Sequence, residues 1–223
     1  MSYQLKLLKK FPSPRSARSP NTKLDTLKHA LSLPRPRGLS LEFGVHRGTT
    51  LNLIADSQPL TTVFGFDSFK GFPEDGREDW QKDFSLGDWR PVLRPNATLI
   101  EGFFEDTLRE FLEKTNQKIA FLHVDCDIYS STKTVFDETL RYLQNGTIIV
   151  FDELVNYKGF LANEMLALFE ASRAGALNFE WVSTRRKVMP LEEFLRNYSE
   201  LPVNMKGFRA LGYEQAAALR VLM

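Results

Sequence analysis

The feature that most constrains the fold of this chain is a repeated alternation of short apolar runs with stretches of helical spacing. Strands are predicted over residues 39–45, 62–66, 98–100, 119–124, 147–151, 179–182 and 216–222. Between them, helices are predicted over residues 49–55, 107–113, 131–143 and 161–171. Strands that alternate with helices indicate right-handed βαβ units and a doubly wound α/β fold with a mostly parallel sheet.

The length of 223 residues suits one domain with a substantial core. We expect residues 1–38 to form a basic N-terminal arm and a helix, and residues 39–223 to form a single domain around a seven-stranded sheet. Polar insertions interrupt the alternation at residues 73–95 and 184–212. Insertions of this length often form lids or binding loops, so we expect them to shape the substrate pocket.

Charge and cysteine content narrow the classes of partner. The net charge is +1, so we expect neither nucleic acid nor an acidic membrane as a partner. No apolar run approaches the roughly 20 residues that a membrane-spanning helix needs. Cys126 is the single cysteine, which fits a reducing, cytoplasmic compartment. Residues 1–24 contain Lys and Arg but no Asp or Glu. Organellar transit peptides share this composition, so an organelle is an alternative location for the protein. Homo-oligomerisation is left open.

The first predicted strand leads into a glycine loop. In open α/β sheets, ligands bind beyond the carboxyl ends of the strands. Gly44 and Gly48 follow the pattern G-x-x-x-G, which lacks the spacing of the pyrophosphate-binding loop G-x-G-x-x-G. Glu42 adds a negative charge that attracts a cation and repels phosphate. The loop therefore indicates a nucleoside ligand without phosphates, although an ordinary strand–turn–helix junction explains the glycines equally well.

An acid at the end of the second predicted strand supports the nucleoside interpretation. Asp67 comes nineteen residues after Gly48. An acid at about this distance binds ribose hydroxyls in nucleotide-binding βαβ folds. The alternative is that Asp67 and Ser68 cap a turn.

Four carboxylates follow two other predicted strands. Asp125 and Asp127 come after residues 119–124, and Asp152 and Glu153 come after residues 147–151. Like charges at one sheet edge are costly unless they share a cation or a proton. Carboxylate oxygens with open positions for water or substrate suit Mg²⁺. The alternative is helix capping, with Asp127 or Ser130 as the cap of the following helix.

Histidine and tryptophan side chains leave further alternatives. His46 either faces the ligand or is an exposed loop residue. His123 lies in an apolar run and is predicted to be a core histidine with a hydrogen-bond partner. Trp80 and Trp89 either stack on a substrate or anchor the first insertion.

The chain resembles the macrocin O-methyltransferase family, which consists of class I methyltransferases acting on sugar hydroxyls in natural-product tailoring. The resembling stretches are residues 41–45, 65–74, 102–108, 123–132 and 146–153. They span roughly residues 39–183, and the second and fourth are the most specific. The resemblance implies a Rossmann-like class I methyltransferase sheet whose last strand is antiparallel.

The resemblance also implies roles for single residues. Glu42, Gly44, Gly48 and Asp67 match S-adenosylmethionine contacts, with Asp67 on the ribose, and we add Ser68, Gly102 and Asp125 to this cofactor set. The implied metal ligands are Asp125, Asp152 and Glu153, and the implied general base is Asp127. Two departures stand out: the family usually has Asp where this chain has Glu153, and the insertion at 184–212 is longer than in short related chains.

Together these features predict a Mg²⁺-assisted O-methylation of a sugar or another vicinal-diol natural product. The metal would fix two adjacent hydroxyls and lower the pKa of one, and Asp127 would accept the proton. Two other functions stay open. One is a metal-dependent hydrolase or transferase that acts on a phosphate ligand. The other is a protein that binds the cofactor without catalysing methyl transfer.

Overall fold

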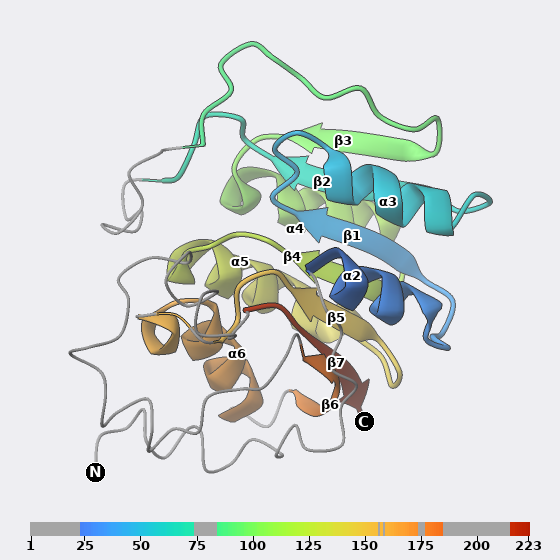
Figure 1. The fold of residues 1–223 in the computed structure, drawn as a ribbon, viewed down its shortest axis with the longest axis vertical. Helices are drawn as coiled ribbons and strands as arrows, with labels where there is room; N and C mark the ends of the chain where they lie inside the picture. Colours follow the sequence, from blue (N-terminus) through green and yellow to red (C-terminus); the bar gives the residue numbers. More distant parts are fainter. Residues whose placement is uncertain (1–22, 74–83, 156, 158, 174–176, 185–214) are drawn as a thin grey trace.

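The computed structural model describes residues 23–73, 84–155, 157, 159–173, 177–184 and 215–223. Within them lies one seven-stranded sheet with the order β3-β2-β1-β4-β5-β7-β6 (Figure 1). The strands are β1 (Leu39–Phe43), β2 (Val63–Asp67), β3 (Ala97–Glu101), β4 (Ile119–Val124), β5 (Ile148–Phe151), β6 (Asn178–Thr184) and β7 (Ala217–Leu222).

Helices cover both faces of this sheet. Buried side chains of α4 (Phe104–Thr115), α5 (Tyr129–Thr139) and α6 (Glu164–Arg173) pack into one apolar cluster with the strands. Side chains of α2 (Lys23–Ser32) and α3 (Thr49–Ser57) pack into a second cluster. Alternate residues of the central strands contribute to the two clusters, which explains why these strands are apolar throughout.

The strand pairings confirm the predicted doubly wound sheet with an antiparallel last strand. β1 is parallel to both β2 and β4, β2 is parallel to β3, and β4 is parallel to β5. β7 is antiparallel to both β5 and β6. The strand order reverses direction between β1 and β4, so the carboxyl ends of these two strands flank the crevice where ligands bind in such sheets.

All seven predicted strands are present, whereas several helix boundaries differ from the prediction. α4 begins at Phe104, three residues before the predicted start. α5 ends at Thr139, and a 3₁₀ turn over Leu140–Tyr142 continues it. A 3₁₀ turn over Phe160–Ala162 precedes α6, because Gly159 adopts a left-handed conformation there.

Three predicted features lie partly or wholly outside the described residues. These are residues 1–22 of the N-terminal arm, residues 74–83 of the first insertion with Trp80, and residues 185–214 of the second insertion. The division into an arm and a single domain stays a prediction. Among the described helices, none has the length and apolar character needed to cross a membrane.

Candidate active site

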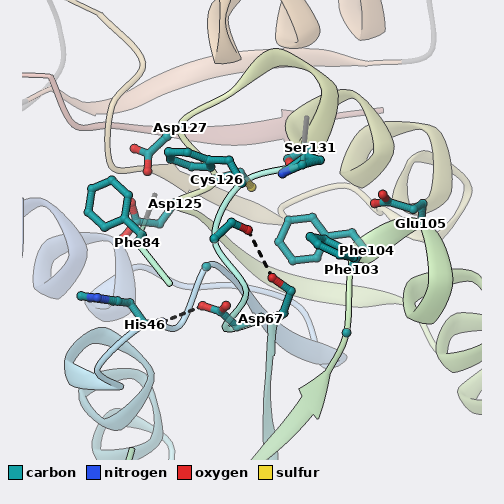
Figure 2. Close-up of a pocket in the computed structure, with 16 residues that line it drawn as sticks. His46, Asp67, Phe84, Phe103, Phe104, Glu105, Asp125, Cys126, Asp127 and Ser131 are labelled. Atoms are coloured by element: carbon teal, nitrogen blue, oxygen red, sulfur yellow. Dashed lines mark hydrogen bonds between the residues drawn. The ribbon is translucent and has the colours of Figure 1, made fainter. Parts of the chain in front are cut away.

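A cavity of about 160 Å³ lies at the carboxyl ends of β1, β2, β3 and β4 (Figure 2). It therefore occupies the predicted position in the sheet. Its lining residues are Gly44, His46, Asp67, Ser68, Gly71, Phe72, Pro73, Phe84, Gly102, Phe103, Phe104, Glu105, Asp125, Cys126, Asp127 and Ser131.

The loops after β1 and β4 touch each other at the base of the cavity. Gly44 has φ +90°, and a Cβ atom on it would lie 1.9 Å from the backbone oxygen of Asp125. The Asp125 N–H in turn donates to the Phe43 carbonyl at 2.9 Å. Gly44 is therefore required both for its positive φ and for this close approach.

Asp67 ends β2 and fixes the glycine loop through its carboxylate. Its Oδ2 atom accepts the backbone N–H groups of Val45 at 2.8 Å and His46 at 2.7 Å. Its Oδ1 atom accepts the Phe69 N–H at 2.7 Å, the turn-capping contact that the sequence left as an alternative. Asp67 thus joins two strand ends while its side chain lines the cavity.

Ser68 and Gly102 complete this side of the cavity. The Ser68 hydroxyl accepts the Lys70 N–H at 3.1 Å and donates to the Gly71 carbonyl at 3.3 Å. The Gly102 N–H donates to the backbone carbonyl of Asp67 at 3.0 Å. Both predicted cofactor residues therefore lie beside Asp67.

The described lining of the cavity is acidic and aromatic. Its four acids come from the end of β2, from α4 and from the loop after β4, and no Lys or Arg is among the described lining residues. Figure 2 shows Asp125 and Asp127 near Phe84, with Asp67 lower in the cavity. His46 contacts Phe84 edge to face, with ring centroids 5.8 Å apart. Burial, followed by the Arg47 charge, lowers the pKa of His46 despite the nearby Asp67. The cavity therefore favours a ligand with positive charge and a planar ring.

Asp125 and Asp127, which were predicted to gather at this edge of the sheet, both line the cavity. Burial, and next the Asp152 and Asp127 carboxylates, raise the pKa of Asp125 well above its usual range, with the Lys23 ammonium acting in the opposite direction. Asp127 has φ +63°, a left-handed conformation that is uncommon outside glycine. Capping of α5 by Asp127 or Ser130 was wrong, because the N-cap is Ile128 and no side chain bonds there.

The turn that carries Asp127 rests on a buried carboxyl group that the sequence did not single out. Oε1 of Glu164, at the start of α6, accepts the backbone N–H groups of Cys126 and Asp127, each at 3.3 Å. The Glu164 side chain is fully buried. Burial, followed by the charge of Asp127, raises the pKa of Glu164 well above its usual range.

The predicted metal ligands do not form an open donor set in this structure. Asp125 lines the cavity, whereas Asp152 and Glu153 are absent from its described lining. The Nζ atom of Lys23 forms an ion pair with Asp152 and lies 3.7 Å from Glu153 Oε1. Among the residues that the structure describes, no group of three His, Cys, Asp or Glu side chains is arranged to hold a metal ion. An ammonium group therefore lies against two of the three carboxylates that were predicted to bind Mg²⁺.

Two other predicted cofactor residues lie away from the cavity lining. The Glu42 carboxylate is fully buried in the sheet, where its Oε1 atom lies 2.7 Å from His123 Nδ1. This contact confirms His123 as a core histidine with a partner. Gly48 is the N-cap of α3 with φ +73°, and a Cβ there would meet Pro91 at 2.8 Å. Their cofactor roles stay predictions from the resemblance.

Residues 41–154 match the model of a methyltransferase domain family. No curated protein sequence matched the chain. Three solved structures with a similar fold are informative. CalS11, a calicheamicin methyltransferase also described as a TDP-rhamnose 3′-O-methyltransferase, is 24% identical over 88% of this chain and 76% of its own, with a TM-score of 0.59.

The other two are also O-methyltransferases. NovP is 18% identical over 89% of this chain and 77% of its own, with a TM-score of 0.54. An enzyme from Bacillus cereus in complex with SAH is 13% identical over 99% of this chain and 90% of its own, with a TM-score of 0.51. The family match covers half of the chain and includes β1, β2, β4, β5 and the loops that form the cavity. The chain therefore belongs to the methyltransferase domain family and is an S-adenosylmethionine-dependent methyltransferase with the class I fold.

Proposed function

We propose that this chain is an O-methyltransferase that methylates a hydroxyl group of a sugar or another vicinal-diol natural product. The observation that carries the proposal is the pairing of Asp125 and Asp127 with Asp67 in one acidic cavity at the switch point of the sheet. TDP-rhamnose 3′-O-methyltransferase activity in a protein of similar fold supports the acceptor class.

The cavity residues suit S-adenosylmethionine better than a phosphate ligand. When bound, S-adenosylmethionine supplies an electrophilic methyl group on a sulfonium. Gly44, Asp67, Ser68, Gly102 and Asp125 are the residues that would hold it. The carboxylates favour its sulfonium and amino group, and the described lining offers no basic side chain for phosphate. This charge pattern argues against the hydrolase or transferase alternative.

Asp127 is the proposed general base. Its side chain lines the cavity, and the Glu164 carboxyl holds its backbone in place. Transfer forms a bond between the hydroxyl oxygen and the methyl carbon while the carbon–sulfur bond breaks, and the Asp127 carboxylate accepts the hydroxyl proton. Alignment of the hydroxyl at about 3 Å from the methyl group supplies much of the rate. Because the Lys23 ammonium lies against Asp152 and Glu153, two of the three predicted metal ligands, this step involves no metal ion.

Calorimetry with S-adenosylhomocysteine and with ATP tests the cofactor half of the proposal. We expect heat of binding with S-adenosylhomocysteine and none with ATP. Binding of ATP alone would favour a phosphate-ligand enzyme. Turnover is then measured as radiolabelled methyl transfer to nucleotide sugars and other vicinal diols. Asp127→Asn is expected to bind S-adenosylhomocysteine normally and to lose about 10²–10⁴-fold in kcat. Binding without transfer to any hydroxyl acceptor would favour the non-catalytic alternative.

A further inference from the structure

Lys23 is the first residue of α2, yet its ammonium group reaches the carboxyl end of β5, 129 residues later in the chain. It forms an ion pair with Asp152, and its Nζ atom lies 3.7 Å from Oε1 of Glu153. The three side chains are 25%, 14% and 2% exposed, respectively. The ion pair is thus largely sheltered from solvent, unlike the exposed pairs that contribute little to stability.

The carboxylates around Lys23 need a cation. Burial lowers the pKa of Lys23, but the carboxylates of Asp152, Glu153 and Asp125 outweigh it and raise that pKa overall. Burial, followed by the charges of Asp152 and Asp127, raises the pKa of Asp125. Several carboxylates held this close in a partly buried site repel one another unless a positive charge lies among them. In this structure a side chain of the protein itself supplies that charge.

We propose that the Lys23 ammonium is the resident cation of the Asp125, Asp152 and Glu153 cluster, and that it excludes a divalent metal from this site. Lys23 is then a positioning residue: it holds the ends of β4 and β5 next to the cavity in the way that a bound metal would. Methyl transfer by this chain consequently needs no divalent metal. Only this last consequence rests on the proposed function.

An ion pair that serves only to stabilise the fold does not explain why Lys23 lies among several carboxylates. A pair that only stabilises the protein would need one carboxylate, and its loss would not change the affinity for metal ions. Here the ammonium lies against two carboxylates, those of Asp152 and Glu153, and also interacts electrostatically with Asp125, which lines the cavity. Removal of the ammonium leaves hard oxygen donors without a cation, which is the donor type that Mg²⁺ and Mn²⁺ bind.

Binding of Mn²⁺, measured by electron paramagnetic resonance without cofactor or acceptor, tests the proposal. Lys23→Met removes the charge and keeps most of the aliphatic length. We expect Lys23→Met to bind Mn²⁺ at least about tenfold more tightly than the wild type, because one positive charge no longer opposes the ion. Lys28→Met is the matched control, since Lys28 is exposed on the same helix, and it is expected to match the wild type. Asp152→Asn in the Lys23→Met background should abolish the gained affinity.

Several results would overturn the proposal. One is equal Mn²⁺ affinity in the wild type and Lys23→Met, whether both bind or neither does. Another is a wild-type enzyme whose methyl transfer stops on chelation and returns with Mg²⁺. If Lys23→Met is unfolded without metal, millimolar Mn²⁺ should restore its far-ultraviolet circular dichroism, and failure of that rescue would also count against the proposal. Since Mn²⁺ binding is measured without substrates, a failure of the proposed function leaves this test intact.

Discussion

The Asp67 carboxylate accepts the backbone N–H of His46 at 2.7 Å, and the same oxygen atom accepts the N–H of Val45. The end of β2 thereby holds the glycine loop after β1 in place. Asp67→Asn replaces one acceptor oxygen with an NH₂ donor. Either the N–H groups of Val45 and His46 or the N–H of Phe69 then lose their acceptor. We expect a loss of about 1–3 kcal/mol in unfolding free energy and weaker binding of S-adenosylhomocysteine. Urea denaturation and calorimetry measure the two effects.

Asp56→Asn is the control for this substitution. Asp56 also accepts hydrogen bonds, but it does so from the exposed Arg94 side chain on the surface. Loss of that exposed pair should change the unfolding free energy little and should leave cofactor binding unchanged. Equal effects at the two positions would show that Asp67 does not organise the loop.

Gly44→Ala tests the contact between the loops after β1 and β4. The added Cβ would lie 1.9 Å from the Asp125 backbone oxygen, and alanine also disfavours φ +90°. We expect destabilisation of about 3 kcal/mol or more. Gly87→Ala shares the positive φ but meets no atom within 4 Å, so it should cost only about 1–2 kcal/mol. Thermal unfolding of the two variants separates steric conflict from backbone strain, and similar melting temperatures would contradict the close approach.

Glu164→Leu removes the acceptor of the Cys126 and Asp127 N–H groups. We expect a loss of about 1–3 kcal/mol in stability and a lower kcat, because the turn with Asp127 loses its support. Glu164→Gln keeps an acceptor oxygen and should retain most of the activity. Wild-type kcat in the leucine variant would rule out a positioning role.

The raised pKa of Glu164 also predicts a pH dependence of stability. Burial and then Asp127 favour the protonated carboxyl in the folded state, whereas the unfolded chain ionises near its ordinary pKa of about 4.3. The folded state therefore binds more protons, and wild-type stability falls as pH rises from about 4.3 through the raised pKa. Glu164→Gln lacks this loss. Denaturation at several pH values should show that the unfolding free energy of Glu164→Gln increases relative to that of the wild type as pH rises. A difference in unfolding free energy that stays constant with pH would refute the raised pKa.

Glu42→Gln tests whether Glu42 contacts the cofactor, as the resemblance implies, or serves only as the buried partner of His123. Glu42 does not line the cavity, and its carboxylate contacts the buried His123. We therefore expect S-adenosylhomocysteine affinity within about threefold of the wild type, and a stability loss of about 1–2 kcal/mol. A loss of affinity of tenfold or more would instead establish Glu42 as a cofactor contact.

Local sequence patterns were enough to predict the sheet but not the electrostatics of the site. The central strands β1, β2, β4 and β5 are apolar runs that end at or just before a glycine or an acid, and their parallel pairing brings Asp67, Asp125 and Asp127 to one edge. The cation at that edge was predicted as a metal because Lys23 lies 129 residues from Asp152 in sequence. Only the packing of α2 against the sheet brings the two together. Glu164 was missed for the same reason, since its partners are 37 and 38 residues away.

The position of β7 between β5 and β6 also constrains how the protein is made. β6 is hydrogen-bonded into the sheet through β7, which follows it by more than thirty residues. During synthesis β6 therefore leaves the ribosome before its strand partner exists, while β5 presents an open edge. Unpaired edges of this kind are templates for association with other chains. We therefore expect nascent chains that stall between the two strands to be prone to aggregation and to capture by chaperones.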